Sequence, residues 1–254
     1  MTLARLLAAA CAAWFVAAAA LADGRLTVAL DPGHGGIDPG AQADGLNEAD
    51  LVLAFARRLE EELLRIGRFD VMLTRTADVF VPLERRMTLA RQAEADVFLS
   101  LHADALPEDA GEATGLTVYT LSDDVTDAAA LRLAERHAGD DILAGLDLTG
   151  TEDEIAMILL DLARRETAPR SLALADTLVE TVGNAGLTLN SKPRRDGAFA
   201  VLKAADVPSV LIELGFLSSA ADRARLRSDA WSERAARAIA QAIALWADAE
   251  AVSR

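Results

Sequence analysis

The chain has 254 residues, of which 52% are hydrophobic, which is enough for one large domain or two small ones. Its 25 lysines and arginines stand against 40 aspartates and glutamates, giving a formal net charge of −15. This balance disfavours a role in nucleic-acid binding, because such binding depends on neutralising phosphates with Lys and Arg. The acidity otherwise indicates only solubility.

Residues 1–22 have the pattern of a secretory signal peptide. Arg5 precedes a long apolar run, which ends in the small-x-small triplet Ala20, Leu21 and Ala22. We expect cleavage after Ala22, which would leave residues 23–254 without a membrane-spanning segment. A retained membrane anchor is the alternative, because the apolar run is only a little shorter than a spanning helix.

Short β-type runs alternate with helical patterns along the rest of the chain. The runs that predict strands are residues 25–31, 69–75, 97–103, 116–121, 199–203 and 209–215. Several are apolar almost throughout, as expected for strands covered on both faces. Amphipathic patterns predict helices over 47–67, 83–95 and 230–250, the first with Asn47 as N-cap and Gly67 as its stop. The alternation predicts an α/β fold, a single domain with a twisted, mostly parallel central sheet flanked by helices.

The alternation stops between residue 122 and about residue 190. This span is helical in pattern, mostly acidic and without a strand signal. We interpret it as a helical insertion in the domain, because it has too little β structure to indicate a second domain. Within it, an i, i+3, i+4, i+7 apolar stripe is formed by Ile155, Ile158, Leu159 and Leu162. The stripe either packs on the domain or docks a partner protein.

Histidines and a glutamate coincide with the ends of predicted strands. His34 follows the first strand in the glycine-rich loop 30–41, and His102 ends the third strand. Glu213 lies in an apolar run, where an ionised carboxylate is costly without a partner. Two histidines with one carboxylate are a common catalytic zinc set, so these positions indicate a metallohydrolase. Ordinary buried histidines are the alternative.

Two further observations narrow the kind of site. The only cysteine, Cys11, lies in the expected signal peptide, so the mature chain has neither a disulfide nor a cysteine-based zinc site. Glu48 opens the first predicted helix and could complete the ligand set, or it could only complement the positive helix start. The loop 30–41 is not a phosphate loop, because it lacks the Lys-Ser/Thr ending and the dinucleotide-binding spacing.

Four segments resemble the zinc-dependent N-acetylmuramoyl-L-alanine amidases, in the right order and over nearly all of residues 25–250. They are VALDPGHGGIDPGA, NEADLVLAFARRL, TRTADVFVPLERRMTLARQAEADVFLSLHADA and VLKAADVPSVLIELGFLSSAADRARL. The resemblance implies that His34, Glu48 and His102 bind Zn²⁺ and that Glu213 is the catalytic glutamate. It also implies a peptidoglycan substrate, cleaved between N-acetylmuramic acid and the L-alanine of the stem peptide.

The insertion resembles that of periplasmic family members that act at the division septum of Gram-negative bacteria. There it closes the active site until an activator protein binds. On this resemblance, residues 131–148 are the occluding part and residues 152–175, with the apolar stripe, are the activator-docking helix. Relatives usually carry an acid where this chain has His137, so we expect His137, or failing it Glu135, to fill the open zinc position. An ordinary surface residue of the helix is the alternative for His137.

Two other functions remain open at the level of sequence. One is a zinc carboxypeptidase that cuts within the stem peptide, which would use a similar ligand set. The other is a non-catalytic wall-binding or regulatory protein. The presence of Glu213 argues against a pure binder, because binding alone does not require a proton-transferring carboxylate.

Overall fold

The computed structural model describes residues 25–106, 113–122, 130–135, 137, 154–203 and 206–253. For residues 154–162 it describes the helical backbone only. The expected signal peptide, residues 1–22, lies outside these ranges. Within the described part of the chain, no helix combines the length and the apolar character needed to cross a membrane.

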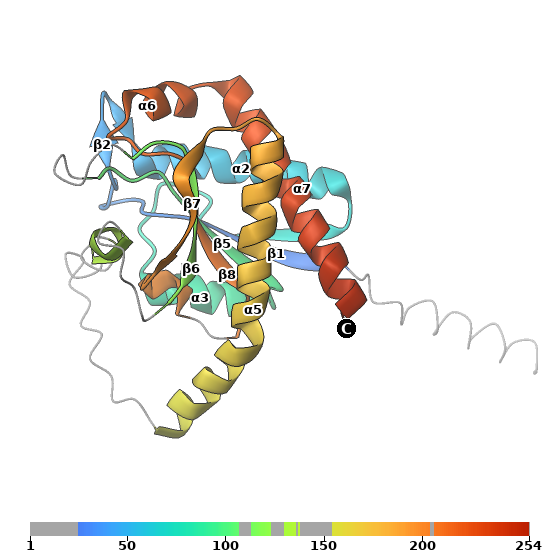
Figure 1. Cartoon of the computed structure of the whole chain (residues 1–254). Coiled ribbons are helices and arrows are strands. Elements are labelled where there is room, and N and C mark those ends of the chain that lie inside the picture. Colours follow the sequence, from blue (N-terminus) through green and yellow to red (C-terminus); the bar gives the residue numbers. More distant parts are fainter. Residues whose placement is uncertain are drawn as a thin grey trace, which may run out of the picture.

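A six-stranded sheet forms the centre of the molecule, in the order β4-β1-β5-β8-β6-β7 (Figure 1). Its strands are β1 (Leu26–Pro32), β4 (Phe69–Leu73), β5 (Val97–His102), β6 (Leu116–Leu121), β7 (Leu189–Gly197) and β8 (Ser209–Glu213). β4, β1, β5 and β8 are parallel, β6 is antiparallel to β8, and β7 is parallel to β6. The mostly parallel sheet predicted from the sequence is confirmed. A small antiparallel hairpin, β2 (Gln42–Ala43) and β3 (Leu46–Asn47), follows β1.

Helices cover both faces of the sheet. One face carries α2 (Glu48–Ile66), α5 (Glu154–Asn184) and α7 (Asp229–Ser253), which is preceded by α6 (Ala220–Leu226). The other carries α3 (Leu83–Gln92), the 3-10 helix η2 (Ala200–Leu202) and the helical residues 130–135. The side chains of successive strand residues point to opposite faces of the sheet. On β5, Phe98 packs in the cluster with α3, and Leu99 packs in the cluster with α2. Burial on both faces explains why the central strands are apolar almost throughout.

Helix α2 begins and ends where the sequence predicts. Asn47 has an extended conformation at the N-cap, although its side chain donates to Asp50 at 3.1 Å instead of capping a backbone amide. Gly67 ends the helix with a φ of 83°, a left-handed conformation that costs glycine little. Because α2 starts directly after β3, its first residue, Glu48, lies beside the loop that follows β1.

Two segments differ from the prediction. Residues 199–203 do not form a strand but contain η2, so that prediction was wrong. A run of only four apolar residues, 199–202, does not distinguish a strand from a buried helical turn. Strand β7 was not predicted, because its sequence LNSKPRRDG is polar and contains a proline. It lies at the edge of the sheet, where it pairs on one side only and tolerates both features.

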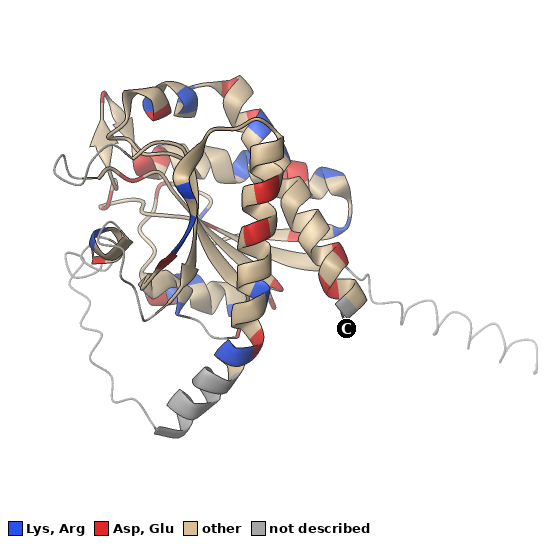
Figure 2. Ribbon diagram, in the orientation of Figure 1, with Lys and Arg blue, Asp and Glu red and all other residues tan. Residues whose placement is uncertain are grey.

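The basic residues of β7 lie beside an acidic helix. In Figure 2, positions of basic residues on β7 lie next to positions of acidic residues on α5. Arg194 of β7 pairs with Asp176 of α5 at 2.9 Å. Both side chains are substantially exposed, so this ion pair adds little to stability.

The C-terminal half of α5 belongs to the core of the domain. Its fully buried residues are Leu174, Ala175, Leu178 and Val182, which pack in one cluster with α2 and α7. The span expected to be an insertion, about 122–190, therefore includes residues that the core requires. The side chains of Ile155, Ile158, Leu159 and Leu162 lie outside the described residues. An amphipathic pattern does not separate a helix that packs on its own domain from one that docks a partner.

Candidate metal centre

The carboxyl ends of β1, β5 and β8 meet at one edge of the sheet. His34 lies two residues beyond β1, His102 is the last residue of β5 and Glu213 is the last residue of β8. His102 and Glu213 are direct partners in the parallel pair of β5 and β8. Glu48 reaches the same place from the first turn of α2. All four side chains predicted to form the site are therefore brought together, and all are buried.

The carboxylate of Glu48 lies between the two imidazoles. Its Oε1 atom is 3.2 Å from Nε2 of His34 and 3.0 Å from Nδ1 of His102. The backbone amides of Ala41 and Ala103 each donate to the carboxylate at 2.9 Å, which fixes its orientation. Ligands of a tetrahedral zinc ion, each about 2.1 Å from the metal, lie about 3.4 Å apart. The Glu48 oxygen is therefore spaced from each imidazole nitrogen nearly as a shared metal ion requires.

The electrostatics of this group favour a cation. Burial opposes the charged form of His34, but the charge of Glu48 and the bond to Asp38 raise its pKa to about 11. Burial likewise opposes ionisation of Glu48, yet the charge of His34 and the bond from His102 hold the pKa of Glu48 well below its usual range. Burial, and then the neighbouring His137, lower the pKa of His102 to about 4. The buried carboxylate thus needs one positive charge beside it, which a metal ion supplies as well as a proton does.

His34 has a strained backbone and a fixed ring. Its φ of 58° lies in the left-handed region, which costs a residue other than glycine about 1–2 kcal/mol. The Nδ1 atom lies 2.7 Å from Oδ2 of Asp38, so that Nε2 faces Glu48. The sequence analysis assigned no role to Asp38. Its place four residues after a candidate ligand, in the same loop, is the signal that could have identified it.

Two glycines leave room for the donor side chains. A Cβ atom at Gly33 would lie 2.3 Å from Cε1 of His102, and one at Gly40 would lie 2.7 Å from Oε2 of Glu48. Gly40 also has a φ of 65°, which side-chain-bearing residues rarely adopt. The glycine-rich loop after β1 is therefore required because the backbone itself lies against the donors.

Glu213 is held by one oxygen only. Its Oε2 atom accepts the backbone N–H of Asp104 at 3.0 Å, whereas Oε1 has no hydrogen-bond partner among the described residues. Burial, reinforced by the charges of Glu48 and Asp104, raises the pKa of Glu213 well above its usual range. A buried carboxyl group that is oriented through one oxygen can accept and return a proton through the other.

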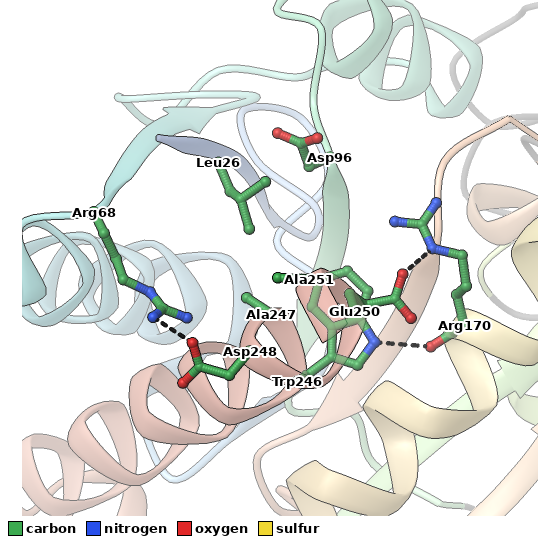
Figure 3. Close-up of a pocket in the computed structure, with 9 residues that line it drawn as sticks. All are labelled: Leu26, Arg68, Asp96, Arg170, Trp246, Ala247, Asp248, Glu250 and Ala251. Carbon is green, nitrogen blue, oxygen red and sulfur yellow. Dashed lines mark hydrogen bonds and ion pairs between the residues drawn. The ribbon is translucent and has the colours of Figure 1, made fainter. Parts of the chain in front are cut away.

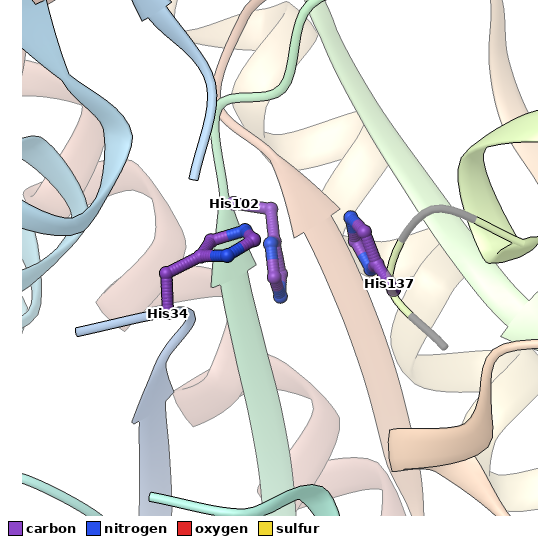
Figure 4. Close-up of side chains that lie close together, drawn as sticks. All are labelled: His34, His102 and His137. Carbon is purple, nitrogen blue, oxygen red and sulfur yellow. The ribbon is translucent and has the colours of Figure 1, made fainter. Parts of the chain in front are cut away.

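The third histidine of the chain completes the cluster. His34, His102 and His137 each place a ring nitrogen within 4.8 Å of the others (Figure 4). His137 stacks on His102, with ring centroids 4.2 Å apart, and its Nε2 atom lies 3.5 Å from Oδ2 of Asp104. Glu135, the other residue considered from the sequence, is exposed. Of these two candidates, the structure brings His137 to the histidine pair and not Glu135.

Apolar contacts anchor the segment that carries His137. Ala130, Leu133 and Ala134 are buried in the cluster formed with α3 and η2. Phe199 contacts the imidazole of His137, with ring centroids 5.5 Å apart. The cavity that remains beside the histidines has a volume of about 20 Å³. Such a space holds about one water molecule.

Comparisons with known proteins agree with this geometry. Residues 28–245 match the family model described as N-acetylmuramoyl-L-alanine amidase. The chain belongs to this family. It is 36% identical to the amidase AmiA of Escherichia coli K12 over 222 residues, which cover 87% of this chain and 75% of AmiA. In shape, it matches the amidase AmiC2 of Nostoc punctiforme with a TM-score of 0.62 at 25% identity, over 89% of this chain and 98% of that chain.

One relative is considerably longer than this member of the amidase family. The chain is 36% identical to the amidase AmiC of Neisseria meningitidis serogroup B over 233 residues. These residues cover 91% of this chain but only 55% of that relative. The family match, over residues 28–245, contains the donor residues of the site.

A second pocket of the amidase lies near the start of β1, away from the histidines (Figure 3). It has a volume of about 300 Å³ and is lined partly by Leu26 and Trp246. Four of its five charged side chains pair with one another: Arg68 lies 2.6 Å from Asp248, and Arg170 pairs with Glu250. The fifth, Asp96, accepts the backbone N–H of Thr27 at 2.9 Å. The pocket therefore lacks the converging donor atoms of the histidine site.

Proposed function

We propose that this chain is a zinc-dependent peptidoglycan hydrolase that cleaves the amide between N-acetylmuramic acid and the L-alanine of the stem peptide. The observation that carries the proposal is the convergence of His34 and His102 on a single carboxylate oxygen of Glu48. Glu213 lies beside this group as the partner strand residue of His102. Membership of the amidase family supports the choice of bond.

The donor set fits zinc, and the surrounding residues fit hydrolysis. Zinc held by His34, Glu48 and His102 would polarise the scissile carbonyl and lower the pKa of the attacking water. Glu213 would take a proton from that water and return it to the departing amine. Water then adds to the carbonyl carbon and the C–N bond breaks. The carboxylate stays on the sugar and the amine of L-alanine leaves with the proton.

The orientation of the imidazole of His34 serves this role. The bond between Nδ1 of His34 and the Asp38 carboxylate places the ring proton on Nδ1. The lone pair of Nε2 then points toward Glu48, on the side where a metal ion would bind. Asp104 contributes by holding Oε2 of Glu213 through its backbone amide, which leaves Oε1 for proton transfer.

We further propose that the described conformation is self-inhibited and that His137 is the plug. The Nε2 atom of His137 has no hydrogen-bond partner among the described residues, so it can serve as a fourth metal ligand. The remaining cavity of about 20 Å³ is far smaller than the ~300 Å³ or more of ordinary ligand pockets. An activator protein that docks on residues 152–175 would open the site by moving residues 131–148.

The biological setting is also a proposal. The expected signal peptide of residues 1–22 and the relatives in Escherichia coli and Neisseria meningitidis support a periplasmic location. There the enzyme would act in wall remodelling and in the separation of daughter cells. The activator is expected to be a protein, because the apolar stripe on the docking helix is of the type that binds in a protein groove.

The test is release of peptides from purified peptidoglycan by residues 23–254, with bound zinc measured alongside. Deletion of all of residues 122–190 is unsuitable, because it would remove α5 from the core. We therefore use His137→Ala to open the site and combine it with Glu213→Gln. We expect intact stem peptides from His137→Ala and none from the double variant.

The products separate the proposed function from its alternatives. Release of single terminal amino acids or shortened stem peptides would indicate a zinc carboxypeptidase. A folded, zinc-loaded chain that binds peptidoglycan and releases nothing, even with His137→Ala, would indicate a binding protein.

A further inference from the structure

Two buried arginines lie against the loop that carries His34. Arg75 follows β4 and Arg86 lies in α3, and each is only 3% exposed. Arg75 donates from Nε to the carbonyl of Pro32 at 2.9 Å and from Nη2 to that of Gly33 at 2.8 Å. Arg86 donates from Nη1 to Pro32 at 2.8 Å and from Nη2 to the carbonyl of His34 at 2.9 Å. Three consecutive carbonyls are thus held by two guanidinium groups.

Arg75 also connects this loop to the helix that carries Glu48. Its Nη2 atom donates to the carbonyl of Ala49, the residue after Glu48, at 2.7 Å. The same nitrogen binds Gly33, the residue before His34. One rigid, planar group therefore sets the distance between the backbone segments of two metal donors.

Arg86 makes the corresponding connection toward the third donor. Its Nη1 atom lies 2.8 Å from Oδ1 of Asp31, at the end of β1. The other oxygen of Asp31 accepts from Oγ of Ser100 at 2.8 Å, two residues before His102 on β5. Asp31 is fully buried and also accepts from Thr74 at 2.6 Å. The arginine pair thereby reaches the backbone segments of all three donors.

We infer that Arg75 and Arg86 are positioning residues of the metal centre. They hold the left-handed backbone of His34 at the distance from Glu48 that a shared metal ion requires. The inference rests on the proposed zinc site, since positioning residues matter only if a metal binds there. Both arginines act through the loop and α2, because their hydrogen bonds end on backbone carbonyls and on Asp31.

Positioning and charge predict opposite effects of removing either arginine. A nearby positive charge repels a metal cation, so its loss would by charge alone strengthen zinc binding. Loss of the donors that hold the ligand loop would weaken it, because supporting contacts of ligands contribute about 10- to 100-fold to metal affinity. A neutral substitution therefore decides between the two explanations: weaker zinc binding indicates lost positioning, and stronger zinc binding indicates lost charge repulsion.

The experiment measures zinc affinity of residues 23–254 by competition with a chelator, on protein shown to be folded by circular dichroism. The variants are Arg75→Gln and Arg86→Gln, and the matched control is Arg91→Gln. Arg91 lies on α3 with Arg86 but forms a surface pair with Asp206 at 2.7 Å. We expect about 10- to 100-fold weaker binding in each buried variant and wild-type affinity in the control. The conservative variants Arg75→Lys and Arg86→Lys retain the charge without the fork, and we expect intermediate losses.

The outcomes are distinct. Folded glutamine variants that bind zinc as tightly as the wild type, or more tightly, would overturn the inference. If a glutamine variant does not fold, its lysine variant replaces it, and wild-type affinity there would overturn the inference as well. A wild-type chain that takes up no zinc would instead overturn the proposed metal centre, and the inference with it.

Discussion

The imidazole Nδ1 atom of His34 lies 2.7 Å from the carboxylate of Asp38, four residues further along the same loop. Asp38 also accepts the backbone N–H of Gly40 at 2.9 Å, so one side chain fixes both the ring and the turn that follows it. Its carboxylate is largely buried, which strengthens both interactions. Asp38 is therefore the residue through which the loop determines which nitrogen of His34 faces the metal site.

We expect Asp38→Ala to weaken zinc binding by about 10- to 100-fold, because the orienting partner of a ligating histidine is lost. Chelator competition on the folded variant measures the effect. Asp50→Asn is the control, since Asp50 is exposed on α2 and contacts Asn47 rather than a donor. Equal zinc affinity in Asp38→Ala and wild type would show that the ring needs no such support.

Substitution of Gly33 should disrupt the metal centre by steric hindrance alone, because it changes no charge. A Cβ atom there would lie 2.3 to 2.7 Å from three ring atoms of His102, so the imidazole must move. We expect Gly33→Ala to lose zinc binding and peptide release. Gly186→Ala is the control, because a Cβ atom at Gly186 would meet nothing within 4 Å. Since the φ of Gly186 is +71°, this substitution should lower the free energy of unfolding by about 1–2 kcal/mol, and it should leave zinc affinity unchanged. Zinc binding by Gly33→Ala at wild-type strength would contradict the assigned role of His102.

Removal of the His137 imidazole should activate the isolated enzyme. If its contacts favour the closed arrangement by about 1.4 kcal/mol, His137→Ala increases the open population, and with it the basal rate of peptide release, about tenfold. Glu135→Ala should have no effect, because Glu135 is exposed. The rate of stem-peptide release without an activator is the measurement. An unchanged rate in His137→Ala would reject His137 as the plug.

The buried pair of Asp31 and Arg86 should make stability depend on pH. Burial opposes the charged form, but the charge of Arg86 and the bonds from Thr74 and Ser100 hold the pKa of Asp31 below its usual value. The unfolded value is about 3.9, so the stabilisation is complete above about pH 4 and is lost as the pH falls through the lower folded pKa. Asp31→Asn should cost about 3–5 kcal/mol of unfolding free energy at pH 7, and the difference from wild type should shrink below pH 4.

Urea unfolding of wild type and Asp31→Asn at pH 7 and pH 3 measures this dependence. Asp206→Asn is the matched control, because Asp206 is an exposed carboxylate that pairs with Arg91, on the same helix as Arg86. This substitution should lower the free energy of unfolding by about 0–1 kcal/mol. A difference between Asp31→Asn and wild type that stays the same at both pH values would contradict the assigned ionisation of Asp31.

The sequence by itself determined the α/β class, the ends of α2 and the strand-end positions of three of the four site residues. It could do so because burial on both faces makes β1, β5 and β8 continuous apolar runs, after which His34, His102 and Glu213 stand out. Family resemblance then assigned their roles, which stay predictions, whereas membership of the family is shown by the match over residues 28–245. Local patterns were insufficient for η2 and β7, since a short buried turn and a polar edge strand do not show the usual periodicity.

Only the tertiary structure decided which side chains meet. The sequence left both His137 and Glu135 as candidates, whereas the structure stacks His137 on His102 and leaves Glu135 exposed. Arg75 and Arg86 look like ordinary charged residues in the sequence, yet both are buried and bind the loop of His34. The physical reason is that periodicity reports burial along one element, whereas contacts between residues far apart depend on how the elements pack.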